Sequence, residues 1–288
     1  MQVQNPTKKQ HYVPQVYLRG FSQDEKCVYS FDLKTELPTQ PIPIESVCRE
    51  NYLYEIKDGN NDFIYMNLME NILCGLEGRF ADYRRRLKNK AFIKSNYKTR
   101  CFLTNQEKDF WKVFITTQML RSPLVLGVAE QFTGEYFGDS LNENNARAIA
   151  IAQCLPFFRE LSPNDNNVFI RMLSPLEDMT MAVGVDESGS IFTSDNPVYC
   201  YAPNYTNSVY EKIIFPICKS LVLILFGGAE KEQYDKNRLI RLEKEEIINI
   251  KKSIAYAAQT RLFSACSFST DDIKIIKEAR KDKQTDLQ

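Results

Sequence analysis

Leu221-Val222-Leu223-Ile224-Leu225-Phe226 is the longest uninterrupted apolar run of the chain, and two glycines follow it. Six residues are far fewer than the roughly 20 that a membrane-spanning helix needs. The run instead predicts a strand buried on both faces, because a strand covered on one face only alternates apolar and polar residues. We therefore expect a fully buried strand in the C-terminal part of the protein.

The segments on either side of this run extend the prediction. Residues 179–193 predict a β-hairpin with its turn at Asp186–Gly189, and Lys212–Pro216 predicts a further strand. A helix is expected over residues 243–262. Another is expected from Ser269, where acidic residues in the first turn favour a helix start.

The N-terminal part predicts more strands, and the middle predicts helices. Cys27–Phe31 and Tyr52–Ile56 predict strands, while the prolines in Glu36–Ile44 indicate an edge strand or a loop. Apolar residues recur every three or four positions from Phe63 to about Asn89, which predicts a long helix. A capping box at Thr104-Asn105-Gln106-Glu107 predicts the next helix start.

This order of elements predicts an α+β fold. We expect a mixed or antiparallel sheet built from N- and C-terminal strands, with a mainly helical segment over residues 62–175. Residues 1–288 are expected to form a single domain in which the helical segment is an insertion; two lobes are the alternative. The polar tail, residues 281–288, is expected to fray.

The composition excludes some classes of site. The chain has 288 residues, one histidine, and 37 basic against 37 acidic residues. A histidine-rich metal site is excluded, because one imidazole cannot supply a pair or triad of ligands. Zero net charge gives no overall attraction to nucleic acid or membrane, so any such binding needs a local patch.

The eight cysteines are scattered and include no CxxC pair. This pattern predicts reduced core cysteines rather than a zinc ribbon or a disulfide framework. The N-terminal residues, MQVQNPTKKQHY, lack the apolar run of a secretory signal. We therefore expect a soluble, cytoplasmic protein without a membrane partner.

The only histidine lies in the segment KKQHYVPQVYLRGFS, residues 8–22, just before a predicted short helix. A helix N-terminus presents free amides that attract anions. Imidazole titrates near neutral pH, so His11 is a candidate general acid or base. The alternative is a packed ring that hydrogen-bonds a carbonyl.

Two other polar segments are candidates for the same site. In Gln118-Met119-Leu120-Arg121-Ser122-Pro123, Gln118 and Arg121 share one helix face and could hold a phosphate. The alternative is an arginine that satisfies carbonyls at a helix end. In Phe192-Thr193-Ser194-Asp195-Asn196-Pro197-Val198, Asp195 could orient a base or hold a metal, or could form an Asx turn.

Charge is concentrated in one segment. Nine basic residues lie between Arg79 and Arg100, with Asp82 as the only acidic residue. Such a segment could hold a polyanionic backbone, or it could be a solvated helix end. The residues expected to contact nucleic acid are Arg84, Arg85, Arg86, Lys88 and Lys90.

A metal site cannot be assigned from the sequence. Glu70 and Glu77 lie seven residues apart on the long predicted helix and therefore share a face. Together with Asp195 they would form an oxygen-rich set that could hold Mg²⁺. Nothing in the sequence indicates that the three carboxylates meet, so the metal requirement stays open.

Several of these segments resemble one family. KKQHYVPQVYLRGFS resembles the signature of a mainly microbial family known as domain of unknown function 4238. The segments VYSFDLKT, CGLEGRFA (which contains Glu77), QMLRSP and FTSDNPV resemble its later motifs, so that the resemblance covers residues 8–268. One late helix departs from the family pattern at Ile254–Arg261. The resemblance implies a site shared by distant motifs, but it implies no reaction.

Our leading hypothesis is a phosphodiester- or nucleotide-directed, nuclease-like hydrolase. His11 would be the acid/base, Gln118 and Arg121 would hold the phosphate, and Asp195 and Glu77 would support them. The basic segment would hold the nucleic-acid backbone. Two alternatives are a non-catalytic module that binds nucleic acid or protein, and a hydrolase or transferase for a small anion.

Overall fold

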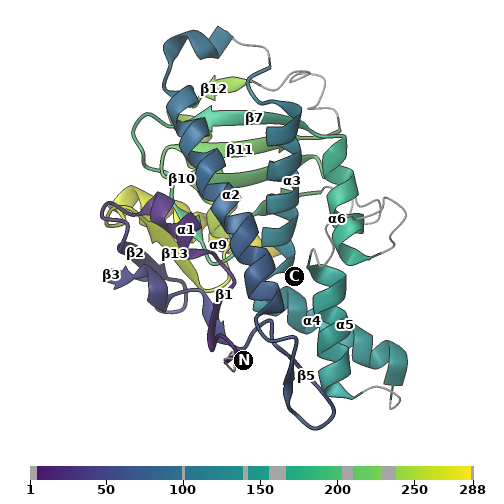
Figure 1. The fold of residues 1–288 in the computed structure, drawn as a ribbon. Coiled ribbons are helices and arrows are strands. Elements are labelled where there is room, and N and C mark those ends of the chain that lie inside the picture. The colour runs from purple at the N-terminus through teal and green to yellow at the C-terminus, as the bar shows by residue number, and fades with distance from the viewer. Residues whose placement is uncertain are drawn as a thin grey trace.

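A five-stranded sheet lies at the centre of the fold (Figure 1). The computed structural model describes residues 5–98, 101–138, 142–155, 167–202, 210–228 and 238–286. The strand order is β12-β7-β11-β10-β9, antiparallel except that β12 runs parallel to β7. These strands are β7 (Thr180–Val185), β9 (Tyr199–Tyr201), β10 (Lys212–Cys218), β11 (Leu221–Phe226) and β12 (Leu239–Arg241).

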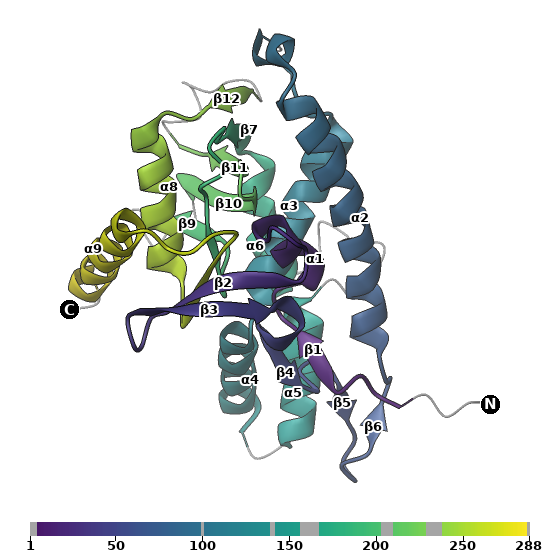
Figure 2. The ribbon, with the colours of Figure 1, turned by 90° about the vertical axis from the view of Figure 1, so that its left-hand side faces the viewer.

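Helices cover both faces of this sheet. The long helices α2 (Leu68–Ala91) and α3 (Asn105–Leu120) lie across one face, and α8 (Lys244–Ala257) lies across the other (Figure 2). All six residues of β11 are buried. The prediction of a strand buried on both faces is therefore confirmed.

A second sheet joins the two ends of the chain. Its order is β3-β2-β13-β8, formed by β2 (Cys27–Asp32), β3 (Leu37–Pro43), β8 (Thr193–Ser194) and β13 (Arg261–Ser264). The predicted α+β fold is thus confirmed, but the N- and C-terminal strands meet in this smaller sheet. The predicted hairpin over residues 179–193 is wrong, because β8 pairs with β13 while β7 pairs with β11 and β12.

Two short strand pairs lie near the N-terminus. They are β1 (Lys9–His11) with β4 (Arg49–Asn51), and β5 (Ile56–Lys57) with β6 (Phe63–Ile64). Most of the predicted strand at Tyr52–Ile56 forms a turn instead. Because Phe63 pairs with β5, α2 begins at Leu68 rather than at the predicted Phe63.

The remaining helices follow the predicted order. The Thr104 capping box is confirmed: Thr104 Oγ1 accepts from the Glu107 amide at 3.2 Å, and the Glu107 carboxylate accepts from the Thr104 amide at 2.8 Å. The other helices are α1 (Gln15–Leu18), α4 (Pro123–Phe137), α5 (Glu143–Cys154), α6 (Val168–Glu177) and α9 (Thr270–Asp286), with short 3-10 turns η1 (Arg19–Phe21), η2 (Ile44–Ser46) and η3 (Lys94–Lys98).

An aromatic cluster ties the N-terminal segment to the central sheet. The Tyr17 ring lies 5.3 Å from Phe215 and 5.9 Å from Phe80, and Phe80 stacks on Phe114 at 4.5 Å. A Cβ on Gly20 would lie 3.0 Å from Arg84 and from β10. Glycine is therefore needed here for close approach of the chain to α2 and β10.

Two smaller features concern the cysteines and the character of the helices. All eight cysteines are free, as the sequence predicted, but Cys74, Cys101 and Cys266 are exposed rather than in the core. Within the part of the chain that the structure describes, none of the helices has the length and apolar character needed to cross a membrane.

Candidate functional site

Arg121 ends α3 and connects three distant segments. Its guanidinium group is buried, with 2% of the side chain exposed. Nη1 donates to Glu77 of α2 at 3.0 Å, Nη2 to the backbone carbonyl of His11 at 2.6 Å, and Nε to the Tyr54 hydroxyl at 3.2 Å. In this geometry the Arg121 guanidinium group binds three acceptors of the protein itself. Arg121 therefore positions neighbouring segments and is not open to bind a phosphate.

Gln118 binds the N-terminal segment one residue further along the chain than Arg121 does. Its Nε2 donates to the backbone carbonyl of Tyr12 at 2.8 Å, so that Gln118 and Arg121 hold the consecutive carbonyls of residues 12 and 11. The predicted shared helix face is therefore present. Gln118 Oε1 is buried and has no hydrogen-bond partner among the described residues. A buried acceptor without a partner is uncommon in folded proteins.

His11 places its ring on the other side of strand β1 from Gln10, because side chains alternate along a strand. Gln10 is fully buried and donates to Glu55 at 2.7 Å. The His11 imidazole is half-buried, with Nε2 3.3 Å from the carbonyl of Glu45. Burial lowers the pKa of His11, although the contact with the Glu45 carbonyl raises it. The neutral ring is therefore favoured near neutral pH.

Asp195 lies in the segment that follows β8 and binds a different part of the chain. Its carboxylate accepts from the backbone amides of Gln259, Thr260 and Arg261 at 2.9, 2.7 and 3.2 Å, and from the Thr260 hydroxyl at 2.5 Å. These contacts fix the turn between α8 and β13. Asp195 also lies close enough to Tyr12 to contribute, after burial and Cys48, to the raised pKa of that phenol.

A cluster of three carboxyl groups, those of Glu55, Glu70 and Glu77, lies near Arg121. Burial raises the pKa of Glu70 to about 7; Arg121 opposes the shift, and Glu77 and Glu55 add to it. Glu70 is partly exposed and lines a cavity of about 290 Å³ with Thr7, Asn67, Asn71 and Cys74. Our sequence-based catalytic set did not include Glu70, although its seven-residue spacing from Glu77 had indicated that they share a face.

Glu70, Glu77 and Asp195 do not come together as a set of three magnesium ligands. Asp195 is engaged by the turn at residues 259–261, whereas Glu77 pairs with Arg121. In the described ranges, no group of three or more His, Cys, Asp or Glu side chains is arranged to hold a metal ion.

Of the five residues predicted to bind nucleic acid, Arg84, Arg85 and Lys90 bind other groups of the protein, whereas Arg86 and Lys88 make no ion pair that the structure describes. Arg84 points inward and donates to the carbonyl of Val16 at 2.6 Å. Arg85 pairs with Asp82 and Lys90 with Glu107, both at 2.9 Å. Arg86 is exposed and lies 5.3 Å from the centre of the Tyr83 ring, and Lys88 is also exposed. Arg100, the end of the predicted segment, lies outside the described residues.

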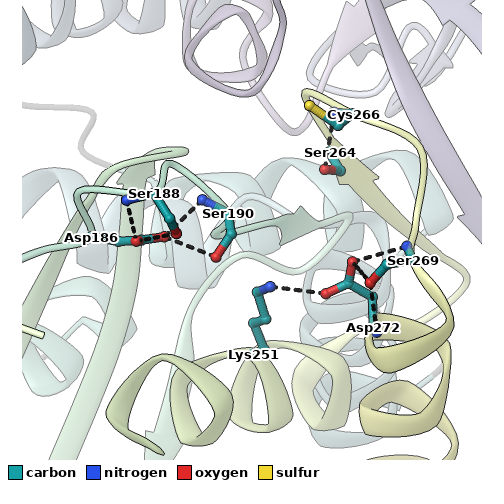
Figure 3. Close-up of polar contacts among 8 residues, drawn as sticks. All are labelled: Asp186, Ser188, Ser190, Lys251, Ser264, Cys266, Ser269 and Asp272. Carbon is teal, nitrogen blue, oxygen red and sulfur yellow. Dashed lines mark hydrogen bonds and ion pairs between the residues drawn. The ribbon is translucent and has the colours of Figure 1, made fainter. Parts of the chain in front are cut away.

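A second polar region lies elsewhere, where the turn after β7 faces α8 and the start of α9. A cleft of about 1030 Å³ is lined there by Asp186, Ser188, Ser190, Lys251 and Asp272, among others. Figure 3 shows Lys251 reaching from α8 to Asp272, with Nζ 2.8 Å from the carboxylate. The Lys251 side chain is 9% exposed. This cleft could not be predicted from the sequence, because its residues lie far apart in the chain and match no motif.

Comparison with known protein families gives a match over most of the chain. Residues 9–267 match the model of a family described as "Protein of unknown function (DUF4238)". No curated protein and no solved structure matches the chain.

Proposed function

Because the chain belongs to the DUF4238 family, whose description assigns no activity, we propose a function from its own geometry: a nuclease-like hydrolase directed at phosphodiesters or nucleotides. One observation carries the proposal. Glu70, a partly exposed carboxyl group with a pKa of about 7, lies on the same helix as an exposed run of basic residues.

The proposed acid/base is Glu70 rather than His11. A group whose pKa lies near the working pH can both accept and return a proton. The Glu70 carboxylate would take a proton from the attacking water as the water oxygen bonds to phosphorus. The bond from phosphorus to the leaving oxygen breaks, and that oxygen then receives a proton from the Glu70 carboxyl group, which returns to the carboxylate form. His11 is retained as the alternative acid/base.

The other predicted residues would act by positioning Glu70. Arg121 and Glu77 form an ion pair, and both charges act on the Glu70 carboxyl group: Arg121 lowers its pKa and Glu77 raises it. Arg121 binds the last carbonyl of β1 and Gln118 binds the next carbonyl, that of Tyr12, while Asp195 holds the turn that precedes β13. None of these three side chains needs to contact the substrate in this proposal.

The substrate backbone would lie along the outer face of α2. Exposed positions recur along the helix at three- and four-residue spacing: Asn71, Cys74, Gly75, Gly78, Arg79, Asp82, Arg85, Arg86 and Asn89. This stripe begins beside Glu70 and continues into the basic half of the helix. Arg79 and Arg86 stack on the rings of Phe110 and Tyr83, which leaves their charges available to phosphates.

A second candidate is supported by the cleft around Lys251. Its volume suits a small metabolite, and a buried ammonium group could hold a phosphate or carboxylate. In that case the protein would be a hydrolase or transferase for a small anion, and the basic face of α2 would have no part in turnover.

Two substrates and two variants separate these candidates. Wild-type protein is incubated, with and without Mg²⁺, with a fluorescent single-stranded RNA and with p-nitrophenyl phosphate. The leading proposal predicts RNA cleavage that Glu70→Gln reduces by at least about 100-fold, within the range that general acid/base catalysis contributes. Lys251→Met should leave that cleavage intact.

The opposite pattern would support the second candidate: turnover of p-nitrophenyl phosphate that Lys251→Met removes and Glu70→Gln does not. Salt-dependent RNA binding without turnover of either substrate would contradict both and indicate a binding module. Glu245→Gln, an exposed change on α8, is the matched control for the loss of one carboxylate.

A further inference from the structure

Helix α4 presents an apolar stripe to solvent. Leu124, Val128, Phe132 and Tyr136 follow one another at four-residue spacing and are 57%, 44%, 67% and 85% exposed. Figure 2 shows α4 beside α5 in the lower part of the molecule, below the central sheet. Soluble monomers rarely expose large contiguous apolar patches, so such a stripe marks an interaction surface.

The two halves of this stripe differ in size. The first half contains Leu124, Gly127 and Val128, and a Cβ added to Gly127 would meet no atom within 4 Å. The second half contains the aromatic residues Phe132 and Tyr136. The side chains of the stripe therefore protrude less at the N-terminal end of α4, the low half, than at its C-terminal end, the high half.

We propose that α4 pairs with α4 of a second copy of this chain, antiparallel and about a two-fold axis. With the axis near Glu130, Phe132 of each copy lies against Val128 of the other, beside the space over Gly127. Tyr136 of each copy lies against Leu124 of the other. Each high half thus meets a low half, as two-fold pairing of a single surface requires.

Charge favours the same orientation. The exposed carboxylate of Glu135 would lie beside the N-terminal turn of the second copy's α4, where a helix attracts negative charge. Parallel pairing would instead place Glu135 against Glu135 and Phe132 against Phe132. It would also leave the space over Gly127 facing its own counterpart.

The size of the surface sets the expected affinity. α4 has 15 residues and is therefore about 22 Å long. One helix pair buries less than the roughly 1,200 Å² at which standard protein interfaces begin. We therefore expect a dissociation constant in the micromolar range, with monomers at nanomolar concentration.

Sedimentation of purified protein from about 0.1 to 100 µM tests the assembly. The expected result is a reversible monomer–dimer equilibrium that Phe132→Asp weakens at least tenfold. Phe132 is largely exposed, so this variant should keep its melting temperature. Leu37→Asp, at a residue 62% exposed on β3, is the matched control and should leave the equilibrium unchanged. Monomers throughout, or a dimer insensitive to Phe132→Asp, would overturn the proposal.

Cross-linking tests the orientation, in protein with Cys74, Cys101 and Cys266 changed to serine. A mixture of Leu124→Cys and Tyr136→Cys chains should cross-link through a short bis-maleimide. Glu135→Cys alone should not, because antiparallel pairing separates the two copies of residue 135 by about 15 Å along the helix axis. Efficient cross-linking of Glu135→Cys to itself, or assembly beyond two copies, would also overturn the proposal.

Discussion

Arg121 Nη2 lies 2.6 Å from the backbone carbonyl of His11, so the end of α3 is fixed to the first strand across 110 residues of sequence. The same guanidinium group is paired with Glu77 of α2. One buried side chain thus connects β1, α2 and α3, and it also sets the electrostatic surroundings of Glu70.

Arg121→Met is expected to destabilise the protein by about 3 kcal/mol, because it removes the buried donor to the Glu77 carboxylate, the Tyr54 hydroxyl and the His11 carbonyl. Equilibrium urea unfolding measures this loss. Arg85→Met is the control: its pair with Asp82 is exposed, and exposed pairs contribute about 0–1 kcal/mol. If both variants lost the same small amount, Arg121 would not have the structural role described above.

The local features of this region could be predicted from the sequence. Helical spacing placed Gln118 and Arg121 on one face, and it placed Glu70 and Glu77 on one face. The acceptors could not be predicted, because Arg121 binds a backbone carbonyl at His11 and Gln118 binds another at Tyr12. Backbone carbonyls are the same at every residue and carry no sequence signal.

Long-range strand pairing was also beyond prediction. A turn sequence between two apolar segments predicts a hairpin, and Asp186–Gly189 has that composition. Ser188 and Ser190 instead bind Asp186 with both their amides and their hydroxyls, which closes the turn locally. The chain then leaves the central sheet, and β8 joins β13. By contrast, β11 was predicted because its burial depends only on its own composition.

Asp195→Asn should destabilise the protein by about 2 kcal/mol. The amide group would turn an NH₂ toward at least one backbone N–H, so that one or two hydrogen bonds to a charged group are lost and a buried donor is left unpaired. Thermal unfolding measures the effect. Asp24→Asn is the control, because Asp24 accepts amides in the same way in an exposed turn and should show a smaller change. An equal loss in both variants would contradict the importance of burial at Asp195.

Stability should fall with rising pH because of Glu70. Its pKa is raised to about 7 in the folded protein, above the value of about 4.3 for an unfolded glutamate. Between these values the folded state binds more protons than the unfolded state, so the free energy of unfolding decreases as the pH rises. This stabilisation by Glu70 is fully present below about pH 4 and is lost as the pH rises through about 7.

Urea unfolding at pH 5.5 and pH 8 measures this contribution as the difference between the wild type and Glu70→Gln. The variant should lose less stability than the wild type between the two pH values. Glu245→Gln, which removes an exposed carboxyl group on α8, should follow the wild type. Parallel pH profiles for all three proteins would show that Glu70 ionises normally, and the acid/base role would then fall to His11.

The basic face of α2 should determine how RNA binding responds to salt. Each phosphate contact on a single strand contributes about −0.7 to the slope of log K against log [salt]. Arg79→Ala with Arg86→Ala removes two exposed guanidinium groups that stack on aromatic rings, so the slope should become less steep by about 1.4. Lys26→Ala with Lys34→Ala removes the same net charge from exposed positions elsewhere and should leave the slope unchanged. Fluorescence anisotropy with a labelled single-stranded RNA over 50–300 mM NaCl gives both slopes. Equal slopes in the two double variants would show that total charge, rather than this helix face, governs binding.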